Sequence, residues 1–281
     1  MPLHNEERWI DECVRSLLAQ DYPQDRYEIV VVDNNSTDTS AARVQQYPRV
    51  RLFHERQQGD FAARNRGVRE STGEIIAFTD SDTAPLPGWL RAIVDGMEST
   101  GASLLVGRLE FGNGAGGLAL LAAYEAEKGH FVFSSAIAPL YYGYTCNMAV
   151  RREVFEQMGT FAPVFRNADV VLVRKVVDAL SPRALSFSDA MRVRRLEVGS
   201  VGQYLRKQMA YGRDFVRYAR VVDVEVLNLG QRFHVFGQTI RRNDLGPIES
   251  AWLLAILAVG ALCYDFMRRT GRSPQVVPSG A

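Results

Sequence analysis

The sequence predicts an α/β fold with a mostly parallel central sheet. Short apolar runs typical of buried strands alternate with stretches of helical periodicity, and two of the runs end in a carboxylate. The runs are Glu28–Asp33, Val50–His54 and Glu74–Asp80, and helices are expected near Glu6–Gln20 and Phe61–Glu70. Ligands of such folds bind at the carboxyl ends of the strands, so Asp33 and Asp80 are the first candidate site residues.

The N-terminal segment is a loop that leads directly into the first helix. Asn5 is a suitable helix cap, and Glu6 and Glu7 are favourable near a helix N-terminus. The segment contains no apolar core of a secretory signal. It also has no preceding strand, although a strand normally leads into such a loop. We therefore expect that the first strand is missing and that the natural chain starts upstream.

Composition excludes several classes of protein. The chain has 281 residues, of which 47% are hydrophobic, so it can bury a large core and is not disordered. A net charge of +1 excludes a globally basic nucleic-acid-binding protein. The cysteines Cys13, Cys146 and Cys263 lie far apart without metal-type spacing, which suits a reducing compartment.

The last third of the chain is basic and then apolar. Between Met191 and Arg220, eight basic residues stand against two acidic ones. This stretch is either a solvated helix face or a surface for anionic lipid head groups or a phosphate-bearing substrate. Nucleic acid is disfavoured because no recognition motif accompanies it.

A second C-terminal segment, Ala251–Tyr264, is uncharged and almost entirely apolar. It is shorter than the roughly 20 residues that span a bilayer, so a buried helix, a helix in the plane of the membrane and a full span are all alternatives. We expect a catalytic domain over residues 1–190, a helical membrane-associating region over 191–270 and a disordered tail over 271–281.

Two carboxylates separated by one residue, Asp80 and Asp82, follow the third apolar run. Such a pair can share a divalent cation that neutralises a diphosphate, although the same pattern is common in turns. Asp33 is followed by Asn-Asn-Ser-Thr-Asp. It can accept hydrogen bonds from a base or a ribose, or it can belong to a helix-capping cluster without a ligand.

Five blocks occur in the order seen in the family 2 glycosyltransferases: Pro2–Glu7, Val32–Asp38, Ala63–Gly67, Phe78–Asp82 and Cys146–Arg152. From Pro2 to about Leu180 the sequence resembles this family. The resemblance implies a GT-A type fold, a nucleotide-sugar donor, a Mg²⁺ or Mn²⁺ ion and inversion at the anomeric carbon.

The resemblance also implies roles for single residues. It places Glu6 near the nucleoside, Asp33 at the nucleobase, Arg64 near the base or diphosphate, Asp80 at the ribose and Asp82 on the metal. Asp169 matches the expected general base, which takes the proton of the acceptor hydroxyl. Its alternative role is that of a helix N-cap.

The sequence departs from the family at two places near these residues. Ala168 replaces the commoner Glu before Asp169, and Arg194 and Arg195 stand where the family often has a His. The two arginines either bind the diphosphate or leave the metal site incomplete. The Gln-x-x-Arg-Trp motif of processive synthases is absent, which favours transfer of a single sugar.

We therefore expect a cytoplasmic glycosyltransferase at the inner face of the cell membrane. Its acceptor is an envelope saccharide or a lipid-linked one, and residues 104–180 are expected to shape the acceptor site. One alternative is a non-catalytic sugar-nucleotide-binding or scaffold relative. Another is a nucleotidyltransferase, which is disfavoured because the N-terminal region lacks a Gly-rich basic loop.

Overall fold

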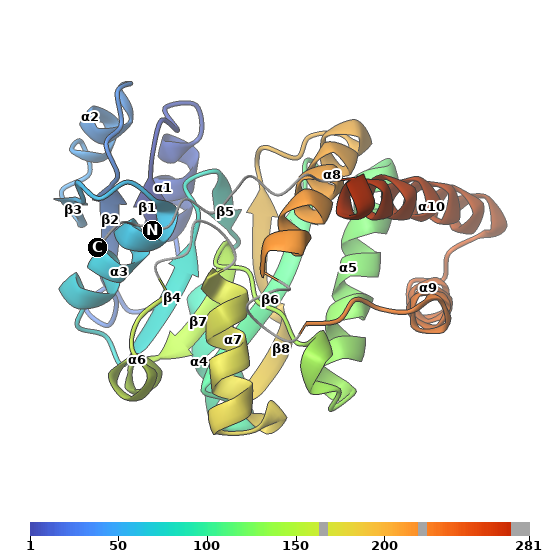
Figure 1. Ribbon diagram of the computed structural model, residues 1–281. Helices are drawn as coiled ribbons and strands as arrows, with labels where there is room; N and C mark the ends of the chain where they lie inside the picture. Colours follow the sequence, from blue (N-terminus) through green and yellow to red (C-terminus); the bar gives the residue numbers. More distant parts are fainter. Residues whose placement is uncertain (163–167, 219–223, 271–281) are drawn as a thin grey trace.

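The computed structural model describes residues 1–162, 168–218 and 224–270. Two β-sheets lie side by side and are flanked by helices (Figure 1). The first sheet is parallel, with the strand order β1 (Pro2–Leu3), β2 (Ile29–Asp33) and β3 (Val50–His54). Its strands confirm two of the predicted apolar runs.

The second sheet has five strands in the order β4-β7-β6-β8-β5. They are β4 (Ile75–Thr79), β5 (Thr83–Pro85), β6 (Leu104–Phe111), β7 (Asn147–Arg151) and β8 (Leu185–Arg195). The β6–β8 pair is parallel, whereas β4–β7, β6–β7 and β5–β8 are antiparallel. The expectation of a mostly parallel arrangement thus holds for the first sheet and not for this one, because a buried apolar run does not encode strand direction.

A short strand does precede the N-terminal loop. The Met1 ammonium group donates a hydrogen bond to the Val30 carbonyl oxygen over 2.9 Å. Pro2 and Leu3 pair with Val32 and Asp33 in parallel register. Pro2 and Leu3, which we expected to belong to the loop, thus form β1 and place the loop beside the end of β2. The start of the natural chain upstream stays a prediction.

Ten helices are described: α1 (Ile10–Leu18), α2 (Ser40–Val44), α3 (Asp60–Glu70), α4 (Trp89–Thr100), α5 (Gly116–Ser134), α6 (Arg152–Met158), α7 (Ala168–Ala179), α8 (Val201–Tyr218), α9 (Leu229–Arg242) and α10 (Pro247–Thr270). One cluster of buried apolar residues includes Val31 of β2, Leu105 of β6 and Ala149 of β7. The two sheets therefore share a hydrophobic core and belong to one folded unit.

The boundary that we expected at residue 190 falls inside β8. The strand continues to Arg195, which pairs with Thr83 of β5. Four of the eight basic residues between Met191 and Arg220 form ion pairs within the protein. Arg192 pairs with Glu110, Arg194 pairs with Glu12, and Arg195 and Lys207 pair with Glu197. These four residues are thus not a free lipid-binding surface.

The structure describes the side chains of only two of the other four basic residues in this stretch. No ion-pair partner is described for Arg206 and Arg213, whereas the Arg217 side chain and Arg220 lie outside the described residues. The tail at 271–281, which we expected to be disordered, lies outside them as well.

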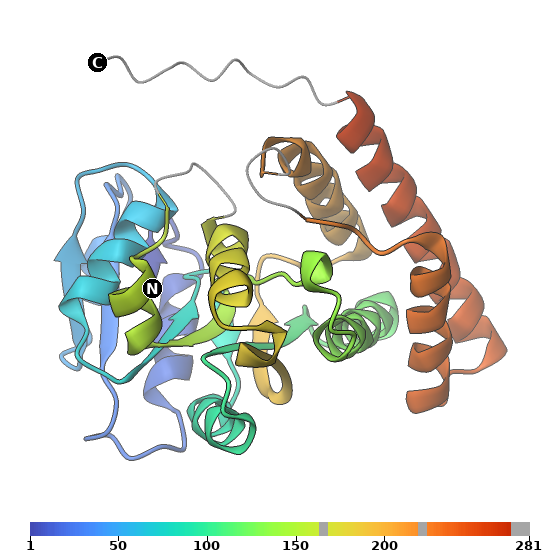
Figure 2. The same cartoon turned by 60° about the horizontal axis from the view of Figure 1, so that its bottom comes forward.

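Helix α10 packs along α8. A Cβ atom at Gly212 of α8 would lie 2.4 Å from the Tyr264 carbonyl oxygen of α10, so only glycine permits this close approach. Figures 1 and 2 show α9 and α10 at the end of the molecule opposite the β1–β3 sheet. The C-terminal helices α9 and α10 therefore pack on α5 and α8, at the side of the molecule away from the ends of β1 and β2.

Candidate active site

The loops after β1 and β2 hold each other in place. Asn5 has a φ of 53°, and its side-chain oxygen accepts a hydrogen bond from the Thr37 N–H over 2.8 Å. The Glu6 N–H donates to Ser40 Oγ over 2.8 Å. These contacts fix Glu6 at the end of the parallel sheet.

A small polar cavity of about 150 Å³ lies at this end of the sheet. It is lined by Pro2, Leu3, His4, Glu6, Asn34, Asp60, Arg64, Asp80, Ser81 and Asp82. Four of the six candidate site residues, drawn from three separate segments of the chain, therefore meet in one cavity. Burial and the negative charges around it raise the pKa of Glu6.

Asp33 does not line this cavity. One of its carboxylate oxygens accepts the Ser36 N–H over 3.2 Å, and the other lies 3.1 Å from His54 Nδ1. Its neighbour Asn34 is the lining residue. The assignment of Asp33 to the nucleobase stays a prediction.

Arg64 and Asp80 form an ion pair in the cavity wall. Arg64 Nη2 lies 2.5 Å from Asp80 Oδ1, and the guanidinium is 5% exposed. Burial lowers the pKa of Arg64, but the charges of Asp80 and Asp60 and the hydrogen bond to Asp80 together outweigh it, and the pKa is raised. Arg64 Nε is buried without a hydrogen-bond partner among the described residues, so it is available to a polar ligand.

Asp82 and Glu197 each carry a buried oxygen without a described hydrogen-bond partner, Oδ1 and Oε2 respectively. The Leu196 N–H donates to the Asp82 carbonyl oxygen over 2.9 Å, which places Glu197 beside Asp82. Burial, together with the charges of Asp80 and Glu197, raises the pKa of Asp82 to about 7. Two buried carboxylate oxygens that lack a donor fit a divalent cation.

The metal fit involves a residue that the sequence did not indicate. Glu197 Oε1 is bound by Arg195 and Lys207, which leaves Oε2 free among the described residues. In the part of the chain that is described, no set of three His, Cys, Asp or Glu residues is arranged to hold a metal alone. The two carboxylates would therefore share the ion with oxygens of a ligand.

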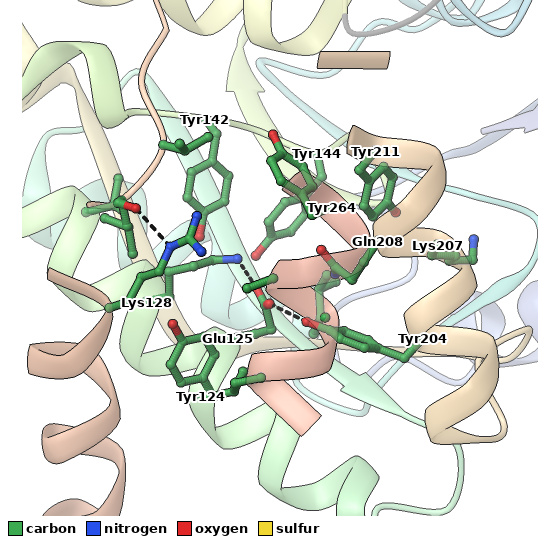
Figure 3. Close-up of a pocket in the computed structure, with 18 of the residues that line it drawn as sticks. Tyr124, Glu125, Lys128, Tyr142, Tyr144, Tyr204, Lys207, Gln208, Tyr211 and Tyr264 are labelled. Atoms are coloured by element: carbon green, nitrogen blue, oxygen red, sulfur yellow. Dashed lines mark hydrogen bonds and ion pairs between the residues drawn. The ribbon is translucent and has the colours of Figure 1, made fainter. Parts of the chain in front are cut away.

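A second, larger cavity of about 610 Å³ meets the first at Asp80, which lines both. Its walls come from β6, α5, the segment 139–146 and the helices α7 to α10. Figure 3 shows that several tyrosines from α5, α8, α10 and the 139–146 segment surround it. A cavity of this size is typical for a small-molecule ligand.

Asp169 lines the larger cavity from the first turn of α7. One of its carboxylate oxygens accepts the Val170 N–H over 2.9 Å, and the other accepts the Thr145 N–H over 3.4 Å. Burial raises the pKa of Asp169 to about 6, against the lowering effect of Arg64. The group is thus ionised near neutral pH and still basic enough to accept a proton.

Residues 1–169 match the family model described as glycosyl transferase family 2. The chain belongs to this family. It is 28% identical to glycosyltransferase AglE of Haloferax volcanii, over 99% of this chain and 95% of that protein. It is also 31% identical to glycosyltransferase GlyG of Streptococcus pneumoniae, over 38% of this chain and 36% of that protein.

Solved structures show the same GT-A fold. The mannosyltransferase PcManGT from Pyrobaculum calidifontis, in complex with GDP-Man and Mn²⁺, superposes with a TM-score of 0.61 at 20% identity, over 96% of this chain and 81% of that chain. S. aureus TarS in complex with UDP-GlcNAc gives a TM-score of 0.54 at 16% identity, over 95% and 82%. The predicted family and fold are confirmed.

Proposed function

We propose that this family 2 glycosyltransferase moves a single sugar from a nucleotide-sugar donor to a lipid-linked or envelope saccharide, with metal dependence and inversion. The observation that carries the proposal is the position of Asp80, which lines both the small polar cavity and the large one. A donor in the first cavity and an acceptor in the second would therefore meet at this residue.

The small cavity has the chemistry of a nucleotide diphosphate site. Arg64 supplies a buried cation, and Asp80 supplies a carboxylate that can accept hydrogen bonds from ribose hydroxyls. Asp82 and Glu197 would hold Mg²⁺ or Mn²⁺. A bound divalent cation would neutralise the charge that develops on the departing diphosphate.

Asp169 would act as the general base. The acceptor hydroxyl oxygen would form the new bond to the anomeric carbon while the bond to the diphosphate oxygen breaks, and the hydroxyl proton would pass to Asp169. A single displacement of this kind inverts the anomeric centre. The buried backbone donors of Val170 and Thr145 fix the carboxylate for that role.

Helices α9 and α10 suggest how the enzyme would reach a lipid-linked acceptor. Leu253, Ile256 and Gly260 of α10 are buried against the protein, whereas Ile248, Trp252, Val259, Leu262 and Phe266 are exposed. These exposed residues recur at spacings of three, four or seven and so form an apolar stripe along one side of the helix.

Helix α10 is long and apolar enough to cross a membrane, but length and composition alone are weak evidence for a span. A helix with one side packed on protein and the other side apolar and exposed is better suited to lie in the membrane interface. We therefore place the enzyme on the inner face of the membrane, with the stripe of α10 in contact with lipid and Arg268 and Arg269 at its end near the head groups.

The double substitution Leu262→Glu with Phe266→Glu is expected to weaken binding to lipid vesicles at least about tenfold, because each side chain contributes roughly 1.5–3 kcal/mol when it leaves water. Both side chains are exposed, at 72% and 62%, so folding is expected to be retained. Co-sedimentation with vesicles measures the change. The matched control is Leu180→Glu, an exposed leucine at the end of α7; equal binding by the double variant and this control would contradict the membrane contact.

The two halves of the proposal have separate tests. Metal-dependent stabilisation by one nucleoside diphosphate, lost on Asp82→Ala, tests the donor half. Transfer that depends on Asp169 tests the acceptor half.

A further inference from the structure

The large cavity has a charged residue that the proposed transfer reaction does not use. Arg232, in the first turn of α9, lines the cavity and is half-buried. Its Nε donates to the Leu227 carbonyl oxygen over 2.9 Å, which fixes the guanidinium in place. Among the described residues, no carboxylate lies within ion-pair distance of it.

The other cation on this side of the cavity is already neutralised. Lys128 of α5 forms an ion pair with Glu125 and lies 5.5 Å from the centre of the Tyr142 ring (Figure 3). Glu125 also accepts a hydrogen bond from the Tyr204 hydroxyl over 2.7 Å. Arg232 is therefore the cation of this region whose charge is not balanced by a described partner. A half-buried guanidinium in such a place favours an anionic ligand.

The wall around Arg232 is apolar and open to the surface. Leu229 and Phe233 of α9 and Leu254 of α10 line the cavity, and they are 70%, 55% and 43% exposed. The cavity is thus continuous with the exposed apolar side chains of α9 and α10. A ligand that enters here meets an apolar surface first, then a cation, and then the chamber that holds Asp169.

We propose that the cavity takes an acceptor whose sugar is joined to an apolar lipid through a phosphate, and that Arg232 binds this phosphate. The inference rests on the proposed function and names the part of the acceptor that Arg232 recognises. The lipid lies along α9 and α10, the phosphate accepts hydrogen bonds from the guanidinium, and the sugar lies among the tyrosines with a hydroxyl directed to Asp169.

The matched variants are Arg232→Gln and Arg241→Gln. Arg241 lies on the same helix, and its Nε likewise donates to a backbone carbonyl oxygen, that of Gly237, over 3.3 Å. It is exposed and does not line the cavity. The probes are dodecyl phosphate below its critical micelle concentration, dodecanol and inorganic phosphate, with binding followed by calorimetry.

The wild type is expected to bind dodecyl phosphate about 10- to 100-fold more tightly than dodecanol, in line with charge-assisted hydrogen bonds. Arg232→Gln is expected to remove this preference while its dodecanol affinity stays unchanged, and Arg232→Lys to restore part of it. Arg241→Gln is expected to behave as the wild type. Inorganic phosphate is expected to bind far more weakly than dodecyl phosphate.

Equal wild-type affinity for dodecyl phosphate and dodecanol would overturn the inference. It would also be overturned if Arg232→Gln and Arg241→Gln lost the preference for dodecyl phosphate to the same extent. Inorganic phosphate that binds as tightly as dodecyl phosphate would make this a small-anion site and not a lipid site. Stabilisation of Arg232→Gln by nucleotide and Mn²⁺, measured in parallel, reports on the donor cavity. A failure of the donor half is therefore seen separately from a failure at Arg232.

Discussion

Asp169→Asn is expected to lower the rate of sugar transfer by about 10²- to 10⁴-fold, the usual contribution of a general base. The amide keeps the size of the carboxylate but cannot take the acceptor proton. Asp169 lines the large cavity and not the small one, so nucleotide affinity is expected to change little. The measurement is release of nucleoside diphosphate in the presence of acceptor, with nucleotide binding determined on the same samples.

The matched control for this variant is Asp178→Asn. Asp178 lies on the same helix, is 65% exposed and pairs with Arg174. The pH profile is a further readout. The base acts only when ionised, so wild-type kcat is expected to fall as the pH drops through about 6, the pKa to which burial raises Asp169. Transfer by Asp169→Asn at the rate of the control would show that another group is the base.

Asp82→Ala is expected to abolish Mn²⁺ binding in the presence of nucleotide, and Glu197→Gln to weaken it at least about tenfold. The reason is that the two buried oxygens Asp82 Oδ1 and Glu197 Oε2 have no described protein donor and would share the ion. The loss of the free Mn²⁺ electron paramagnetic resonance signal measures binding without reference to turnover.

Glu110→Gln is the control for the metal experiment. Glu110, like Glu197, is held by an arginine of β8, but neither of its carboxylate oxygens is buried without a described partner. If Glu197→Gln binds Mn²⁺ as tightly as this control does, Glu197 is not a ligand. The ion would then be held by Asp82 and the diphosphate alone.

Local patterns predicted the strands that carry the donor site. Val50–His54 was expected with the bounds that the structure has, and Glu28–Asp33 and Glu74–Asp80 enclose β2 and β4, because short apolar runs between polar loops are typical of buried strands. A Cβ at Gly117 of α5 would lie 2.9 Å from Val201 Cγ2 of α8, a long-range contact that no local pattern contains.

Site residues whose position depends on pairing between distant segments could not be predicted from the sequence. Glu197 reaches Asp82 only because β8 pairs with β5, more than a hundred residues earlier in the chain. Glu197 lies in the turn directly after β8, so its position becomes predictable only once the end of β8 and its pairing with β5 are known. The position of Arg232 in the cavity wall likewise depends on the packing of α9 on α5, which the sequence pattern does not show.

The central claim, a metal-dependent nucleotide-sugar site, is tested most directly by thermal unfolding of the purified protein with UDP, GDP, CDP and dTDP, each with and without Mn²⁺. One nucleotide with Mn²⁺ is expected to stabilise the protein by about 2.7 kcal/mol at a hundredfold excess over its Kd, and Asp82→Ala to lose this effect. Cooperative unfolding that no nucleotide shifts would contradict the claim and favour a relative without a working donor site.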